Sequence, residues 1–402
     1  MARRLWITGR ILRAMATPLA PDRRLDLDWI RIAAFLLLIA YHVGMYYVSW
    51  DWHVKSPAAS PAIEPLMLLV NPWRLGVLFL VSGAATAFIV AKLAPGALAR
   101  SRSWRLLVPL VFSMLVIVVP QSYFEVVEKG GYTGSFWEFW GRYLRADRTF
   151  CRGADCLVVP TWNHLWFVAY LWVYTMALAA VLAWKPGFRE RAERKLEAAL
   201  AGWRLLVVPA LVLAVIRIAL VGRFGSTHAL VDDWYNHAQY FTVFAFGFLA
   251  ARSPAIWEGM ERLRWPALLA ALASWGFLAW YFLFRDDLNN PPEALRLFQR
   301  VVYAIDQWTA MVAACGFARR LVKADSPARR YLTDAIFPFY IVHQTAIIAF
   351  AVWLRPLALP PAIEGLLLLA ATAAACVATY ELVRRVGWLR PLFGLKGAAP
   401  RA

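Results

Sequence analysis

The sequence predicts an all-α integral membrane protein, a bundle of about ten transmembrane helices with both termini in the cytoplasm. Apolar residues make up 61% of the 402 residues and charged residues only 17%, a composition that excludes an ordinary soluble domain. The apolar residues are gathered in stretches of about 20, the length that a helix needs to cross a bilayer. Lys and Arg are concentrated in alternate connections between these stretches, which is typical of a multi-pass membrane protein.

Ten apolar stretches are long enough to be membrane spans. In order along the chain they lie near residues 29–48, 72–92, 104–121, 163–184, 203–222, 236–252, 264–284, 301–320, 331–354 and 362–383. Polar residues mark five of them, namely Arg31 and His42 in the first, Arg74 at the start of the second, Arg102 and Arg105 at the start of the third, His164 at the start of the fourth, and His343 in the ninth.

The net charge of +18 is explained by orientation in the membrane rather than by nucleic-acid binding. With the N-terminus inside, Lys and Arg greatly outnumber Asp and Glu in the cytoplasmic segments, whereas the outer loops are almost neutral. Residues 1–24 form a basic cytoplasmic tail without the apolar core of a signal peptide. Its first half allows either an amphipathic helix on anionic lipid or a mobile tail. Residues 25–390 form the transmembrane domain, and residues 391–402 are a second cytoplasmic tail.

The longest outer loop covers residues 122–162 and contains Cys151 and Cys156. An oxidising compartment outside the membrane permits a disulfide between them, and two free thiols are the alternative. No His or second Cys pair lies near them, so a zinc site is not expected. The same loop carries four aromatic residues that form either a small core or a surface lying on the membrane, Phe136, Trp137, Phe139 and Trp140.

His42 and Arg31 are the most informative polar residues because they share one helix inside the membrane. They are eleven residues apart, about three helical turns, which places both on one face at a separation of about 16 Å. Both side chains are costly in lipid and must face protein or water. An imidazole can accept a proton near neutral pH. The pair therefore favours a membrane enzyme in which His42 is a general base.

Five segments in this order resemble the acyltransferase 3 family of membrane O-acyltransferases. They are Asp28-Trp-Ile-Arg31 through Tyr41-His42, Trp73-Arg74 leading to Leu78-Phe-Leu-Val-Ser-Gly83, Arg102-Ser-Trp-Arg105-Leu-Leu-Val-Pro109, His164-Leu-Trp-Phe167, and Phe337-Pro-Phe-Tyr-Ile-Val-His343. Trp52-His53-Val54 and Tyr380-Glu381 resemble a branch of the family that acts on periplasmic glucans. One motif departs from the pattern, because some relatives carry Arg-x-x-Arg at the start of the second span, where this chain has only Arg74.

The resemblance implies an enzyme of the bacterial inner membrane that uses cytoplasmic acyl-CoA, either acetyl-CoA or succinyl-CoA, as donor substrate. The acceptor is then a hydroxyl of a periplasmic or cell-envelope carbohydrate, with the glucans favoured. No tightly bound cofactor and no metal ion is implied. His42 would deprotonate the hydroxyl, directly or with a transient acyl-histidine.

The other candidate residues divide between the two faces of the membrane. Arg31, with Arg102 and Arg105, would hold the phosphates of coenzyme A, although topology alone also accounts for Arg102 and Arg105. Arg74 would stabilise the oxyanion or hold the distal carboxylate of a succinyl group. His343, His53 and His164 would line the substrate site, and for each of them a packing role is the alternative.

A multi-span transporter or flippase for a sugar, a lipid-linked glycan or an organic anion is the competing class. Such proteins usually show two related halves with broken helices at matching positions, and the sequence shows no such symmetry. The expected partners are therefore the lipid bilayer, acyl-CoA and a carbohydrate, without nucleic acid. The motifs specify neither the acyl group nor the oligomeric state.

Overall fold

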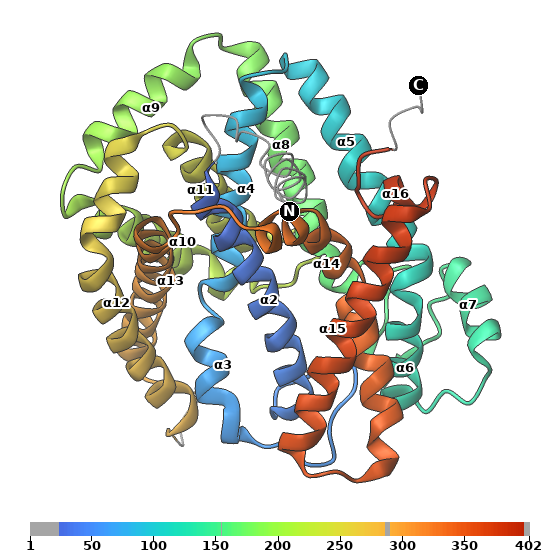
Figure 1. Ribbon diagram of the computed structural model, residues 1–402. Helices are drawn as coiled ribbons and strands as arrows, with labels where there is room; N and C mark the ends of the chain where they lie inside the picture. Colours follow the sequence, from blue (N-terminus) through green and yellow to red (C-terminus); the bar gives the residue numbers. More distant parts are fainter. Residues whose placement is uncertain (1–23, 154, 286–289, 398–402) are drawn as a thin grey trace, which may run out of the picture.

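The computed structural model describes residues 24–153, 155–285 and 290–397, where nearly all secondary structure is helical (Figure 1). The helices are α2 (Leu25–Tyr47), α3 (Glu64–Val70), α4 (Arg74–Val90), α5 (Pro95–Phe112), α6 (Val119–Gly130), α7 (Phe136–Leu144), α8 (Trp166–Trp184), α9 (Phe188–Ala199), α10 (Arg204–Phe224), α11 (Trp234–Ala250), α12 (Pro254–Leu283), α13 (Glu293–Leu321), α14 (Pro327–Leu354), α15 (Pro361–Arg385) and α16 (Leu389–Leu392). Short 3₁₀-helices are η1 (Pro61–Ile63), η3 (Asn163–Leu165) and η4 (Arg355–Leu357), and η2 (Ser113–Ile117) is a π-helix. Two strands, β1 (Cys151–Arg152) and β2 (Asp155–Cys156), form a hairpin. The predicted N-terminal tail up to residue 23, with its amphipathic segment, lies outside the described residues.

The predicted all-α membrane class is confirmed, whereas the count of ten spans stays a prediction. Among the described residues eight helices are long and apolar enough to cross a membrane, and the bent pair Pro95–Ile117 and Val119–Gly130 is a ninth if it is counted as one span. At the remaining predicted position, 236–252, which is the sixth along the chain, the structure has α11 (Trp234–Ala250). Its 17 residues are at the lower limit for a span.

α12 and α13 begin well before the apolar stretches that predicted them. α12 starts at Pro254 and α13 at Glu293, where the sequence placed spans from 264 and 301. The Ser253 side chain accepts a hydrogen bond from the backbone N–H of Ile256 and caps α12, and Pro254 occupies the first turn. The apolar pattern marks only the part of a helix that meets lipid, so it does not report these polar first turns.

α4 and α11 cross with their backbones in contact. A Cβ atom at Gly83 would collide with the carbonyl oxygen of Phe244, and one at Gly247 would collide with that of Leu80. Small residues allow such close approach between helices in a membrane, where packing replaces the hydrophobic effect. The glycine that ends the motif Leu78 to Gly83, in the middle of the second span, therefore has a structural reason, and the crossing fixes the helix that carries Arg74.

A bend of 41° separates the segment ending at Ile117 from α6, and side chains satisfy the carbonyls at the break. The last carbonyls of a helix have no partner within it, and leaving them bare in a membrane is costly. Tyr143 Oη donates to Met114 O at 2.9 Å, Trp140 Nε1 to Leu115 O at 3.0 Å, and Thr345 Oγ1 to Ile117 O at 2.6 Å. The bend is thereby held by α7 and α14.

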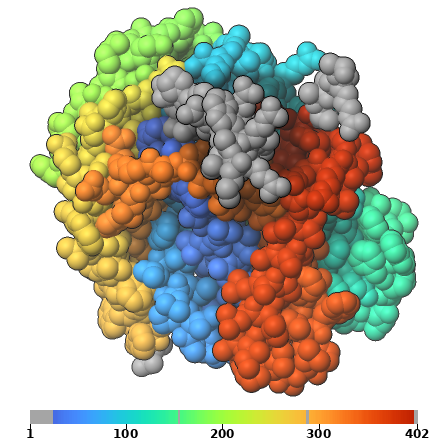
Figure 2. Space-filling view, in the orientation of Figure 1, coloured from blue at the N-terminus to red at the C-terminus, as the bar shows by residue number. Residues whose placement is uncertain are grey.

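The predicted outer loop 122–162 folds into a small lobe around α6 and α7, visible at the edge of the bundle in Figure 2. Phe139 is fully buried in an aromatic core with Tyr143 and Phe150, whereas Trp137 is 72% exposed. Cys151 and Cys156 form a disulfide that joins the two strands. The loop therefore has the aromatic core that the sequence allowed, and contact of Trp137 with the membrane stays a prediction.

Candidate active site

His42 of α2 is hydrogen-bonded to His343 of α14. The distance from His42 Nδ1 to His343 Nε2 is 2.8 Å, and the two rings are parallel within 2°. His343 Nδ1 lies 2.8 Å from the backbone oxygen of Tyr340. A carbonyl oxygen only accepts, so Nδ1 of His343 carries its proton and Nε2 of the neutral ring accepts from His42. This assignment leaves Nε2 of His42 with a lone pair, as a general base requires.

His164 is fixed in place by α14 and by Gln121 of α6. Its Nε2 donates to the backbone oxygens of Tyr340 and Ile341 at 3.1 and 3.2 Å, and Gln121 Nε2 donates to its Nδ1 at 3.4 Å. The His164 ring also stands edge-on to His343, with ring centroids 5.0 Å apart. With both of its nitrogens engaged, His164 orients His343 and α14.

His53 joins the same network from the loop that follows α2. Its Nδ1 lies 2.5 Å from Glu125 Oε2, and its Nε2 accepts from Gln344 Nε2 at 2.9 Å. Gln344 also donates to Gln121 Oε1 at 3.0 Å. The structure therefore brings together all four histidines that the sequence selected, from α2, the following loop, η3 and α14.

A cavity of about 350 Å³ opens beside the His42 and His343 pair. Its walls include His42, Arg74, Trp166 and His228, together with Asp51 to His53 of the loop that follows α2. His228 stacks on Trp166 with ring centroids 4.1 Å apart. Burial lowers the pKa of His228 to about 4, so its ring is neutral at pH 7 and is both a donor and an acceptor.

Arg74 is buried at the first turn of α4, in the wall of this cavity. It donates to the backbone oxygen of Asn71 at 2.8 Å and to its side-chain oxygen, and its guanidinium lies 3.5 Å from the centroid of the Tyr41 ring. Nε of Arg74 has no hydrogen-bond partner among the described residues. A buried cation with a spare donor can stabilise negative charge that develops in the cavity.

Arg31, Arg102 and Arg105 gather near one another at the inner end predicted for the bundle. The charge of Arg102 interacts with the charges of the other two, and its Nη2 donates to Thr86 Oγ1 at 3.3 Å. Arg31 donates to the backbone oxygen of Thr333 of α14 at 3.1 Å. None of these three arginines lines the cavity at His42.

The ion pair of Asp28 reaches across the bundle. In the structure Asp28 Oδ2 lies 2.5 Å from Nη1 of Arg329, a fully buried residue of α14 that also binds Asp325 at 2.5 Å. The pair therefore ties the start of α2 to the start of α14 and supports the register of His42 and His343.

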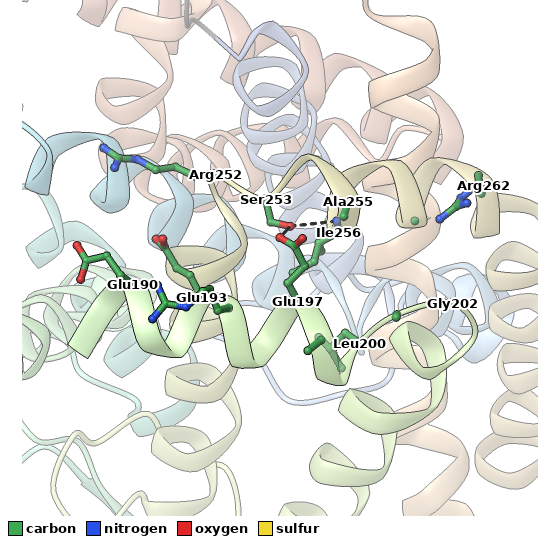
Figure 3. A pocket seen from close by; sticks show the side chains of 14 residues that line it. Glu190, Glu193, Glu197, Leu200, Gly202, Arg252, Ser253, Ala255, Ile256 and Arg262 are labelled. Carbon is green, nitrogen blue, oxygen red and sulfur yellow. Dashed lines mark hydrogen bonds between the residues drawn. The ribbon is translucent and has the colours of Figure 1, made fainter. Parts of the chain in front are cut away.

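Two other cavities contain none of the predicted site residues. The larger, about 620 Å³, lies between α9 and the start of α12, where Glu190, Glu193 and Glu197 extend from α9 and Ser253 donates to Glu197 at 2.5 Å (Figure 3). An apolar groove of about 300 Å³ runs between α2, α4 and α13 past Trp29 and Leu37. Of these three cavities, the one at His42 is lined by histidines and the other two are not.

The sequence reasoning missed four polar residues of the site, namely Gln121, Glu125, His228 and Gln344. A signal existed for two of them, because Gln344 follows His343 within an apolar stretch and Gln121 ends another. A polar residue inside a span is functional or structural by default. His228 and Glu125 lie outside the predicted spans, where polar residues are ordinary, so no pattern distinguished them.

A family model and relatives of known name both match almost the whole chain. The family model described as Acyltransferase domain matches residues 24–381. Glucans biosynthesis protein C of Salmonella gallinarum is 22% identical over 381 residues, which are 93% of this chain and 95% of that protein. The protein of the same name from Escherichia coli O6:K15:H31 is 22% identical over 393 residues, 96% of this chain and 97% of its own length. No solved structure matches the chain.

Proposed function

Because the chain belongs to the acyltransferase 3 family, whose model it matches over residues 24–381, we propose that it transfers an acyl group from cytoplasmic acyl-CoA to a glucan hydroxyl. Family membership makes the protein a membrane acyltransferase and decides against the transporter alternative. The names of the relatives favour a glucan as acceptor. The acyl group of this proposal is acetyl or succinyl, and the membrane is the bacterial inner membrane.

The proposed topology has ten spans with both termini in the cytoplasm. In Figure 1 α9, α16 and the first turn of α5 lie toward one end of the bundle, the loop before α3 lies at the other, and the lobe of α6 and α7 projects from the side. The first end is rich in Lys and Arg, which supports its cytoplasmic placement. The loop with Asp51 to His53 lines the cavity at His42 and leads from α2 toward the second end, which supports entry of a glucan from outside the membrane.

In the proposed reaction Nε2 of His42 removes the proton of the acceptor hydroxyl. The oxygen then forms a bond to the thioester carbonyl carbon, the carbon–sulfur bond breaks, and the leaving thiolate takes the proton back from His42. His343 keeps His42 in the required tautomer and accepts the hydrogen bond of the imidazolium that forms. Arg74 stabilises the tetrahedral oxyanion, or holds the carboxylate of a succinyl group. The hydrogen-bonded His42 and His343 pair beside a cavity is the observation that carries this proposal.

The donor would bind through its phosphates at Arg31, Arg102 and Arg105, since guanidinium groups bind phosphate at two points. Arg31 and His42 are about 16 Å apart along α2, a distance that the pantetheine arm has to bridge. Arg31, Arg102 and Arg105 do not line the cavity at His42. In this proposal donor binding therefore opens a passage beside α2.

The function is tested with membranes that contain the wild-type protein or His42→Ala. Labelled acetyl-CoA and labelled succinyl-CoA are added separately, and the acylated glycan is identified by mass spectrometry. Wild-type membranes are expected to label a glucan and His42→Ala membranes to label none. Equal labelling by both would overturn the role of His42, and label only in a non-glucan acceptor would overturn the substrate. Label held covalently by His42 itself would establish the acyl-histidine variant.

A further inference from the structure

The loop between α10 and α11, residues 225–233, has an unusual backbone beside the cavity. Three of its residues other than glycine have left-handed φ angles, His228 at 58°, Leu230 at 69° and Asp232 at 58°. Such conformations are strained for residues with a Cβ and persist only where the surroundings impose them. The loop therefore has a fixed shape that its own backbone preferences do not explain.

Asp233 is the centre of the contacts that impose this shape. It is fully buried and accepts hydrogen bonds from the backbone N–H of His228 at 2.9 Å and of Thr227 at 3.3 Å, and also from Tyr170. Tyr170 Oη in turn accepts from the backbone N–H of Leu230 at 3.1 Å. The carboxylate and the phenol together hold both halves of the loop against α8.

Two further bonds tie the loop to its neighbours. Trp162 Nε1 donates to the backbone oxygen of His228 at 3.1 Å, and His237 Nε2 donates to that of Leu230 at 2.7 Å. These contacts fix the backbone at His228, whose ring stacks on Trp166 in the wall of the cavity that His42 shares, with its Nε2 3.4 Å from Ser226 Oγ. The indole N–H of Trp166 donates to no described residue.

We propose that loop 225–233 is a preformed clamp for the acceptor, in which the stacked rings of His228 and Trp166 pack against a sugar and their nitrogens bind its hydroxyls. This inference rests on the proposed function, since it assigns the acceptor half of the same site. Aromatic rings present flat apolar faces with polar edges, which suits a sugar ring. A rigid loop loses little conformational entropy on binding, and this supplies a reason for the strain.

Direct binding tests the clamp independently of catalysis. The full chain in detergent micelles is titrated with a radiolabelled linear β-glucan oligosaccharide, without acyl-CoA. His228→Phe keeps the stack on Trp166 but removes both ring nitrogens, so its Kd for the oligosaccharide is expected to rise about tenfold. His228→Asn, which tolerates a left-handed φ, restores part of the affinity. Val231→Ala is the matched control, because Val231 is 72% exposed in the same loop and lies outside the cavity wall.

Asp233→Asn is the second variant, which loosens the clamp without touching the cavity wall, and it should weaken binding about as much as His228→Phe. Unchanged affinity in both variants, or no binding by the wild type, would overturn the clamp. Failure of the proposed function looks different, because wild-type membranes then transfer no label to glucan although the oligosaccharide still binds. Transfer with unaltered acceptor KM in both variants would leave the function standing and refute the clamp.

Discussion

Replacing His343 tests whether the two histidines act as a unit. His343→Ala removes the acceptor for His42 Nδ1, which lies 2.8 Å away in a buried part of the bundle. Loss of such a partner costs about 1–3 kcal/mol, and about 1.4 kcal/mol on the barrier changes the rate tenfold. We therefore expect kcat to fall about 10- to 100-fold, a smaller loss than for His42→Ala, which removes the proposed base.

The assay measures initial rates of label transfer to glucan as a function of acyl-CoA and acceptor concentration. His343 lies far from Arg31, Arg102 and Arg105, so KM for acyl-CoA is expected to stay constant while kcat falls. His343→Gln supplies an amide oxygen that can accept from His42 Nδ1, and it should recover part of the lost rate. Elution of each variant from a size-exclusion column at the wild-type volume shows that the protein is folded.

Two results would refute this reasoning. One is a kcat of His343→Ala within about twofold of the wild type, since the hydrogen bond would then contribute nothing to the barrier. The other is a loss expressed wholly in KM, which would assign His343 to substrate binding rather than to positioning of His42.

Three further predictions follow from other parts of the structure. Arg31→Ala should raise KM for acyl-CoA about tenfold or more with a smaller change for acceptor, because the proposed contact with a donor phosphate is lost. An unchanged KM for acyl-CoA would contradict the proposed binding of donor phosphates at Arg31. Gly83→Leu should abolish accumulation of folded protein, since a side chain there collides with the backbone of Phe244; normal yield in membranes would show that α4 and α11 separate readily. Between pH 6.5 and pH 4 the melting temperature of the wild type should fall more steeply than that of His228→Phe. The pKa of His228 is lowered in the folded protein, so on acidification the unfolded chain binds the proton first and the folded state loses stability. Parallel curves of melting temperature against pH would show that the ring is not buried.

Much of the membrane fold could be predicted because hydropathy is a local property. A stretch of apolar residues must become a helix in lipid, whatever its neighbours are, since every backbone group has to be paired. Hydropathy did not predict the places where side chains of other segments, rather than the helix's own backbone, pair with the backbone carbonyls. The third span bends after Ile117 because Tyr143, Trp140 and Thr345 cap its carbonyls, and those partners come from outside the segment.

The sequence by itself determined which helix carries Arg31 and His42 and that both share one face, because the period of an α-helix depends only on the backbone. It also determined the family, through motifs that match in order. Only the tertiary structure decided that His42 meets His343, 301 positions further along the chain, and that Gln344 and Glu125 hold His53. These contacts depend on how α2, α6 and α14 pack and rotate against one another. That packing is set by shape complementarity across the whole bundle, which no local pattern encodes.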